Sequence, residues 1–305
     1  MVNSIYFAIT NNCNLECAHC FRDSGPGKKN TTISYENFQR VIDNLPKEDT
    51  KLTLTGGEIF TEKDKLYGFL EYLNGIKEKY NFRGGKYFEI VLQTNAFWAI
   101  NESKIEEILR EIDGFGVNEL DVTSDDDYHY AQGIKSENLG KLKHFFWDTR
   151  SSFENIVHVD LRGAGVRIMP IGRGKKFEKD NEYINFHSCG NNLNNSRLHL
   201  TVNEIGEVFP CCFGVFPLEG NLIEQPLQKI VENALKNPKI SALNVNGICE
   251  LARKDGWDAR ELEAQIDTLG ECGFCYHNYI KNGLHRKIRE RKGQSWQRVI
   301  KNILN

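Results

Sequence analysis

Hydrophobic residues in the first half of the chain follow two different spacings. Ile5, Phe7 and Ile9 occupy every second position, as in a strand with one buried face. After Ser34, a suitable helix N-cap, apolar residues recur at helical spacing. The two patterns then repeat and predict strands at 51–55, 87–93, 119–123, 156–161 and 166–169, and helices at 64–80, 103–112 and 136–148.

This alternation predicts an α/β fold in which helices connect the strands of a parallel sheet. The 305 residues, of which 40% are hydrophobic, suffice for one large domain or two moderate ones. Parallel strands joined by helices can also close into a barrel, and in such barrels the reactive side chains gather at the carboxyl ends of the strands. Chemistry is therefore expected directly after each predicted strand.

The second half of the chain has a different character. Charged residues and asparagines replace the regular pattern after about residue 172. A β-hairpin (198–209) and two helices (226–236 and 259–268) are predicted beyond it. The tail, 281–305, has eight Lys or Arg residues against one Glu. It is expected to be an amphipathic helix that packs on the domain, or alternatively contacts an acidic peptide. We predict three segments: 1–172, 173–280 and 281–305.

Charge and composition narrow the classes of function. A net charge of −3 gives no indication of a nucleic-acid partner. No apolar run is long enough to span a membrane, and the first ten residues lack the features of a signal peptide. Nine cysteines without a secretory signal favour the reducing cytoplasm and metal or redox use over disulfides.

Three of these cysteines, Cys13, Cys17 and Cys20, directly follow the first predicted strand. Soft thiolate ligands select iron–sulfur clusters or zinc. A cubane cluster held by three thiolates keeps one iron open to a small molecule. Zinc would need a fourth ligand close by, and His19 is a candidate.

Polar motifs also follow the next three predicted strands. Gly56-Gly57-Glu58 ends the second, and its glycines permit close backbone approach while the carboxylate suits a cation. Thr94-Asn95-Ala96-Phe97-Trp98 follows the third strand. Ser124 ends the fourth and precedes an acidic stretch that contains Asp126, Tyr128 and His129.

The C-x3-C-x2-C spacing together with Gly-Gly-Glu resembles the radical S-adenosylmethionine (SAM) enzymes. The resemblance implies a partial (β/α)6 TIM barrel and a [4Fe–4S] cluster on the three cysteines. In that family the open iron binds SAM, and an electron from the cluster cleaves it to a 5′-deoxyadenosyl radical that takes hydrogen from the substrate. The resemblance further implies SAM contacts from Gly56, Gly57, Glu58 and Ser124. It also implies a substrate pocket that Asp126, Tyr128 and His129 line. Asn95 would contact SAM or substrate, or only shape its turn.

A second group of cysteines has the layout C…G-x4-C…C-x2-C, formed by Cys189, Cys211, Cys272 and Cys275. This layout resembles the twitch domain, a shortened SPASM extension of radical SAM enzymes. It implies a small C-terminal domain of a β-hairpin plus helices that holds a second [4Fe–4S] cluster with no open iron. A structural zinc site is the alternative, because four thiolates also suit zinc.

Two cysteines remain, Cys212 and Cys249, and either is a plain buried thiol or a hydrogen donor. The motifs are most similar to radical SAM peptide epimerases of the epipeptide type. In those enzymes the second cysteine of a Cys-Cys pair donates hydrogen, which corresponds to Cys212. An aminoglycoside epimerase also has a donor cysteine in its C-terminal half, to which Cys249 would correspond.

The expected function is therefore epimerisation of a carbon centre in a peptide or aminoglycoside-like natural product. The expected cofactors are two [4Fe–4S] clusters and SAM, with an electron donor of the flavodoxin or ferredoxin type. The lack of a winged-helix module ahead of Cys13 argues against a leader-dependent peptide. One alternative is a dehydrogenase or another maturase that uses the second cluster. A non-catalytic iron–sulfur or zinc scaffold is the other.

Overall fold

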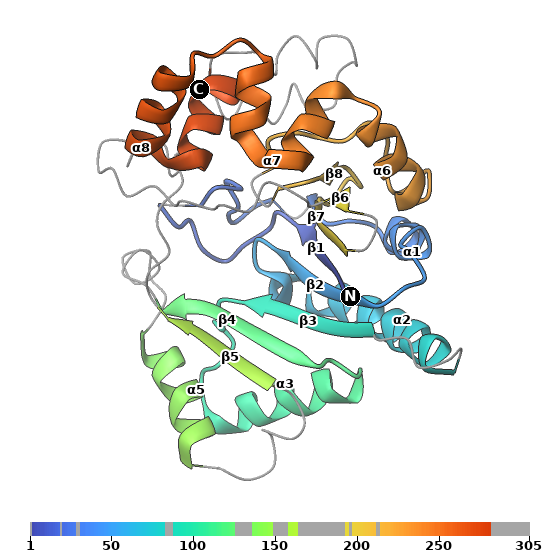
Figure 1. The fold of residues 1–305 in the computed structure, drawn as a ribbon. Helices are drawn as coiled ribbons and strands as arrows, with labels where there is room; N and C mark the ends of the chain where they lie inside the picture. Colours follow the sequence, from blue (N-terminus) through green and yellow to red (C-terminus); the bar gives the residue numbers. More distant parts are fainter. Residues whose placement is uncertain are drawn as a thin grey trace.

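A parallel sheet forms the centre of the molecule in the computed structural model (Figure 1). The structure describes residues 2–18, 20–28, 31–82, 88–125, 136–148, 158–163, 193–194, 197–211 and 214–281. Successive parallel strands are β1 (Asn3–Thr10), β2 (Thr50–Gly56), β3 (Phe88–Thr94), β4 (Glu119–Asp125) and β5 (His158–Gly163). Each begins within two residues of its prediction from the alternating pattern, and the α/β class with a parallel sheet is confirmed.

Helices connect these strands, as the hydrophobic spacing predicts. They are α1 (Tyr35–Asp43), α2 (Lys63–Phe82), α3 (Glu102–Gly114) and α5 (Ser136–Asp148). Ser34 caps α1 as expected, because its side chain accepts a hydrogen bond from the N–H of Asn37. Asn101 caps α3 in the same way.

The predicted hairpin is also present, but its first strand has a role that sequence patterns do not reveal. β7 (Arg197–Val202) pairs in antiparallel fashion with β6 (Leu193–Asn194) and β8 (Val208–Phe209). It also pairs with β1 in parallel, so the sheet order is β5-β4-β3-β2-β1-β7-β6. β1, the first strand in the sequence, thus lies inside the sheet between β2 and β7.

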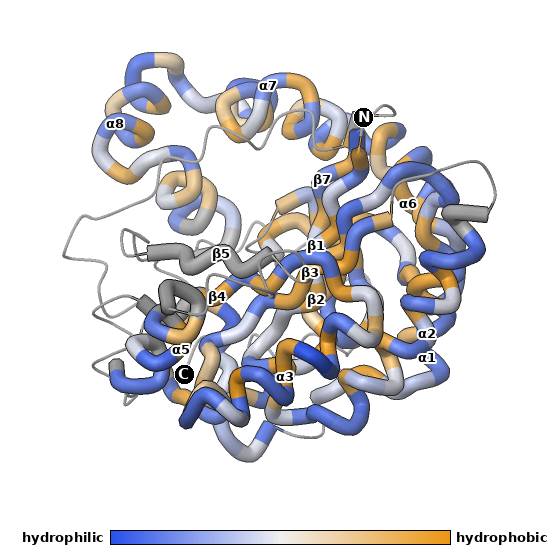
Figure 2. Tube along the Cα trace, turned by 90° about the horizontal axis from the view of Figure 1, so that it is seen from below, coloured by the Kyte–Doolittle hydropathy of each residue, from blue (hydrophilic) through white to orange (hydrophobic). Residues whose placement is uncertain are grey.

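Between the hairpin and residue 281 the structure describes three helices, α6 (Leu227–Leu235), α7 (Pro238–Lys254) and α8 (Ala259–Cys275), with a short π-helical segment after them (Tyr276–Lys281). Both views place α7 and α8 on the side of the sheet away from α3 (Figures 1 and 2). Gly247 and Gly270 break α7 and α8 with positive φ angles of 71° and 69°.

The glycine two residues before Cys249 predicts a loop at this cysteine. This prediction is wrong, because Cys249 lies in the second part of α7. Gly247 interrupts this helix without ending it, since buried Ile248, Leu251 and Ala252 restore helical spacing beyond the break.

Stacked aromatic rings hold the connecting helices against the sheet. Phe38 of α1 lies between Phe7 of β1 and Phe69 of α2, with ring centroids 5.5 and 4.1 Å away. All three side chains are fully buried. Figure 2 shows the same division more broadly, with hydrophobic colour concentrated in β1 to β3 and mixed colours on the outer helices.

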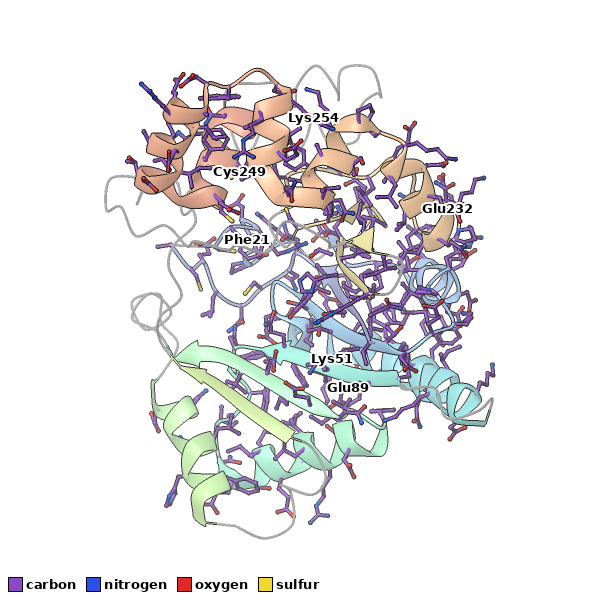
Figure 3. The ribbon with its side chains drawn as sticks, viewed as in Figure 1. Phe21, Lys51, Glu89, Glu232, Cys249 and Lys254 are labelled. Carbon is purple, nitrogen blue, oxygen red and sulfur yellow. The ribbon has the colours of Figure 1, made fainter. Side chains whose placement is uncertain are left out.

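The edge of the sheet where the parallel strands begin carries an ionic cluster. Lys51 of β2 contacts Glu89 of β3 at 3.0 Å and also pairs with Glu119 of β4 (Figure 3). Burial lowers the pKa of Lys51, but its hydrogen bonds to both glutamates outweigh this effect and raise the pKa overall. Charges at this edge of such a sheet serve stability, since the chemistry lies at the other edge.

Three predictions about the fold fall outside the described residues. They are the strand at 166–169, the segment boundary near 172 and nearly all of the basic tail. The three-segment division therefore stays a prediction. Among the helices that the structure describes, none combines the length and the apolar character that a bilayer span requires.

Phe38→Ala should lower the free energy of unfolding by about 3–5 kcal/mol, because it opens a cavity between two buried rings. Ile100→Ala is the control, since Ile100 is 52% exposed and its loss should cost no more than about 0.5 kcal/mol. Denaturant unfolding of both variants measures the difference. Equal losses would contradict the assigned core.

Candidate active site

The strands β1 to β4 end side by side, which brings together the motifs that follow them. Thr10 at the end of β1 is in register with Gly56 at the end of β2, and Leu92 of β3 pairs with Leu54 of β2. In Figure 1 the loop after β1 runs between the sheet and the C-terminal helices. The predicted gathering at the carboxyl edge is therefore present in the fold.

The three N-terminal thiols lie in one closed loop, residues 11–28, here called the cysteine loop. Its two ends are joined, because Cys13 N–H donates to the carbonyl of Gly25 at 3.2 Å. Ser24 Oγ also donates to Asn11 Oδ1 at 2.6 Å. The side-chain amide of Asn12 donates to Glu62, the last residue of the short 3-10 helix Ile59–Glu62 that follows β2, at 2.9 Å. The loop is thus closed on itself and fastened at its base to the segment that follows β2.

The thiols themselves are mostly enclosed and receive backbone hydrogen bonds. Cys13 and Cys17 are buried against Leu15, and Cys20 packs beside them. The N–H groups of Leu15 and Ser24 point to the sulfurs of Cys13 and Cys20 at 3.4 and 3.3 Å. Such N–H···S contacts favour thiolates and are typical around iron–sulfur clusters.

The donor set fits an iron–sulfur cluster by its chemistry. The positions of the side chains do not support the cluster further. Among the residues described, no three His, Cys, Asp or Glu side chains converge as metal ligands. Metal binding and ligand organisation are coupled, so convergence is expected on loading. His19, the candidate fourth zinc ligand, lies outside the described residues.

Gly56 and Gly57 are required by the backbone of the cysteine loop. A Cβ on Gly56 would lie 2.2 Å from the carbonyl oxygen of Thr10, and one on Gly57 would lie 2.1 Å from that of Asn12. The N–H of Gly57 donates to the carbonyl of Thr10 at 2.8 Å. The glycines thus allow the end of β2 to touch the base of the loop. Their contact with SAM stays a prediction.

Glu58 joins the ends of β2 and β3. Its fully buried carboxylate accepts hydrogen bonds from the N–H of Asn95 at 2.7 Å, the hydroxyl of Thr94 at 2.8 Å and the N–H of Phe60 at 3.1 Å. Burial raises the pKa of this carboxyl to about 7, although the three hydrogen bonds oppose the rise. Sequence reasoning expected a carboxylate beside a cation and missed this bridge.

Asn95 shapes its own turn and also contacts the cysteine loop. Its Oδ1 accepts the N–H of Phe97 at 3.1 Å, and its Nδ2 donates to Oδ1 of Asn14 at 2.9 Å. Ala96, between Asn95 and Phe97 in the turn, has a positive φ of 56°. The turn-shaping role is therefore observed, and a contact with SAM or substrate stays a prediction. Only the position of Asn14 among the cysteines could have pointed to this link.

The predicted SAM contact of Ser124 and the predicted substrate contacts cannot be placed together from the described part of the chain, and they stay predictions. Ser124 lies in β4, near its carboxyl end, but its side chain is outside the description. Asp126, Tyr128 and His129 also lie outside the described residues.

Of the C-terminal cysteines, the described part of the chain contains four, and three of them contact one buried cluster. Cys211 and Cys249 pack against a buried cluster around Phe274, and Cys275 belongs to it. Cys272 is buried in α8, three residues before Cys275. Figure 3 draws Cys249 on α7 above Phe21, the residue after Cys20. Cys189 and Cys212 lie outside the described residues.

The family follows from comparison of the sequence with known proteins. The radical SAM superfamily matches residues 7–185, more than half of the chain. The chain therefore belongs to the radical SAM superfamily. It is a radical SAM enzyme that binds SAM and an iron–sulfur cluster.

Similar proteins include YydG of Bacillus subtilis (strain 168), named as a candidate peptide biosynthesis protein. It is 25% identical over 298 residues, which cover 86% of this chain and 88% of YydG. AlbA of the same strain, a biosynthesis protein of the antilisterial bacteriocin subtilosin, is 45% identical over 56 residues, 18% of this chain and 12% of AlbA. The crystal structure of BtrN with AdoMet and 2-DOIA shares the fold, with a TM-score of 0.54, 18% identity, and coverage of 82% and 89%.

The pKa of Glu58 makes stability depend on pH. Because the folded pKa of about 7 exceeds the ordinary 4.5, the protonated form is favoured on folding. This contribution is full below pH 4.5 and is lost as pH rises through about 7, by roughly 3 kcal/mol.

Glu58→Gln should abolish this pH dependence and still destabilise the protein by about 1–3 kcal/mol, because an amide cannot accept all three hydrogen bonds. Thermal unfolding between pH 5 and 8 measures both effects. Glu36→Gln, on an exposed side chain, is the control and should leave the profile unchanged. A Glu58→Gln profile that matches wild type would rule out the buried carboxyl as its cause.

Proposed function

We propose that Cys13, Cys17 and Cys20 hold the SAM-binding [4Fe–4S] cluster at the carboxyl edge of the sheet. The closed cysteine loop, its two N–H···S contacts and its seat on Gly56 and Gly57 support this assignment. The bound cluster and SAM supply one-electron chemistry that removes a hydrogen atom from a substrate. The chain contributes the cysteine loop, which Asn95 contacts through Asn14, and the joined ends of β2 and β3, which the hydrogen bond between Glu58 and Asn95 stabilises.

The proposed substrate is a peptide. The observation that carries this choice is the similarity to YydG, which extends over most of both chains and is named for peptide biosynthesis. The short match to AlbA points the same way. An aminoglycoside-like substrate is the second candidate.

The proposed reaction is epimerisation of one carbon centre, with Cys212 as the first choice of hydrogen donor and Cys249 as the second. A hydrogen atom leaves one face of the carbon, and the thiol returns one to the opposite face. The resulting thiyl radical is restored to the thiol by one electron from a flavodoxin- or ferredoxin-type donor and one proton from solvent. The position of Cys249 just after the break in α7 supports its inclusion.

A second [4Fe–4S] cluster on Cys189, Cys211, Cys272 and Cys275 completes the proposal. The burial of Cys272 and Cys275 in α8, and the N–H···S contact of Val215 with Cys211 at 3.4 Å, support it. Dehydrogenation, in which this cluster accepts an electron, is the alternative reaction. A zinc ion at these thiols would exclude dehydrogenation by this route, because zinc cannot accept an electron.

Anaerobically reconstituted protein should contain about eight irons per chain, four for each cubane cluster. Replacing Cys13, Cys17 and Cys20 together by Ala should halve this number and abolish deoxyadenosine formation. Cys272→Ala should lower iron content and solubility together, because thiolate-metal binding is coupled to folding.

Cys249→Ala is the matched control for iron content, since it removes a thiol without removing a proposed ligand. Full SAM cleavage by the triple variant would refute the first site. Zinc in anaerobically produced protein would refute the second cluster.

Product formed in heavy water should carry one deuterium at the inverted carbon, because a thiol hydrogen exchanges with solvent. Cys212→Ala should keep SAM cleavage and lose this product, and Cys249→Ala should keep both. Mass spectrometry and chiral analysis of the product measure the outcome. If both variants form wild-type product at the wild-type rate, dehydrogenation becomes the better proposal.

A further inference from the structure

An ion pair connects the cysteine loop to the second half of the chain. Arg22, two residues after Cys20, contacts Glu204 through its Nη2 at 2.9 Å. Both side chains are only 17% exposed, so this pair is better shielded than the surface pair between Arg40 and Glu36.

The two residues meet because of the position of β7. This strand pairs in parallel with β1, and its last residue, Val202, is in register with Phe7, so the chain after β7 leaves the sheet at the edge from which the cysteine loop also leaves. Glu204 follows β7 by two residues. The ion pair therefore closes the outer side of the loop, opposite the side that Gly57 supports.

Glu204 projects from a turn that is held on both flanks. Oδ1 of Asn203 accepts the N–H groups of Ile205 and Glu207 at 3.2 and 2.9 Å. The side chain of Asn221 donates to the carbonyl of Ile205 at 2.8 Å. The turn that carries Glu204 is thus held by hydrogen bonds that do not involve Arg22.

Arg22 lies inside the turn that surrounds Cys20. The N–H of Asp23 donates to the Cys20 carbonyl at 3.3 Å, and the N–H of Ser24 donates to the Cys20 sulfur at 3.3 Å. Holding Arg22 from outside therefore holds the turn that delivers the N–H to the sulfur. Hydrogen bonds to cluster sulfurs raise the reduction potential of iron–sulfur clusters.

We propose that Arg22 and Glu204 are positioning residues that keep the Ser24 N–H on the Cys20 sulfur and thereby set the reduction potential of the SAM-binding cluster. The inference rests on the proposed role of Cys20 as a cluster ligand. It does not depend on the substrate or on the second cluster.

A competing role for Arg22 is a direct contact with a bound group. Nε of Arg22 is buried and has no hydrogen-bond partner among the described residues. If that contact or the positive charge itself were what mattered, exchanging the two side chains would not restore function. The exchange variant R22E/E204R therefore separates the two roles.

The first measurement is amide hydrogen exchange of residues 20–28 in metal-free protein. Arg22→Glu and Glu204→Arg should each speed exchange roughly three- to tenfold, because an attractive pair becomes repulsive. R22E/E204R should return exchange to the wild-type rate. The control exchange R40E/E36R, on the exposed pair of α1, should leave residues 20–28 unchanged.

The second measurement is the midpoint potential of the cluster whose EPR signal changes when SAM is added. Glu204→Gln removes a negative charge, which through space alone would raise the potential. Loss of the N–H···S contact lowers it, so the proposal requires a lower potential for Glu204→Gln. A raised or unchanged potential, or fast exchange in R22E/E204R, would overturn the proposal. A SAM-responsive signal that survives Cys20→Ala would instead refute the proposed ligand.

Discussion

The contact between the end of β2 and the base of the cysteine loop is the constraint on which the site depends. Here two backbones touch without side chains between them, through the N–H of Gly57 on Thr10 and that of Glu58 on Asn12. Any Cβ on either glycine would overlap a carbonyl oxygen. The place of the thiols above the sheet is therefore fixed by main-chain atoms, which substitutions elsewhere cannot easily move.

Two further strands, β3 and β7, add to the support that this contact gives. Glu58 fastens the start of the β3 loop, and Asn95 carries that restraint back to Asn14 in the cysteine loop. On the other side, β7 brings Glu204 to Arg22. The loop is thus held by neighbours from β2, β3 and β7, while its thiols stay at the centre. A loop that must hold a cluster and admit a small molecule needs such support, because loops alone position ligands poorly.

Local patterns made much of this predictable. The strands β1 to β4 and the helices between them follow from spacing, and Ser34 marks its helix by its capping chemistry. The break at Gly247 concealed α7, because a glycine with mixed neighbours also indicates a loop. The bridge from Glu58 to β3 and the ion pair of Arg22 join residues 36 or more positions apart. Such links depend on strand order, which hydrophobic spacing does not encode.

The place of β1 between β2 and β7 also has a consequence for how the protein is made. A ribosome adds about 5–20 residues per second, so β1 waits roughly 10–40 s for β7 to be synthesised. During that interval one edge of β1 is unpaired, and an unpaired strand edge invites association with other chains. The thiol loop likewise lacks its outer support until then. Metal delivered to the nascent chain would meet three cysteines on a half-built scaffold, so correct loading belongs after synthesis of the hairpin.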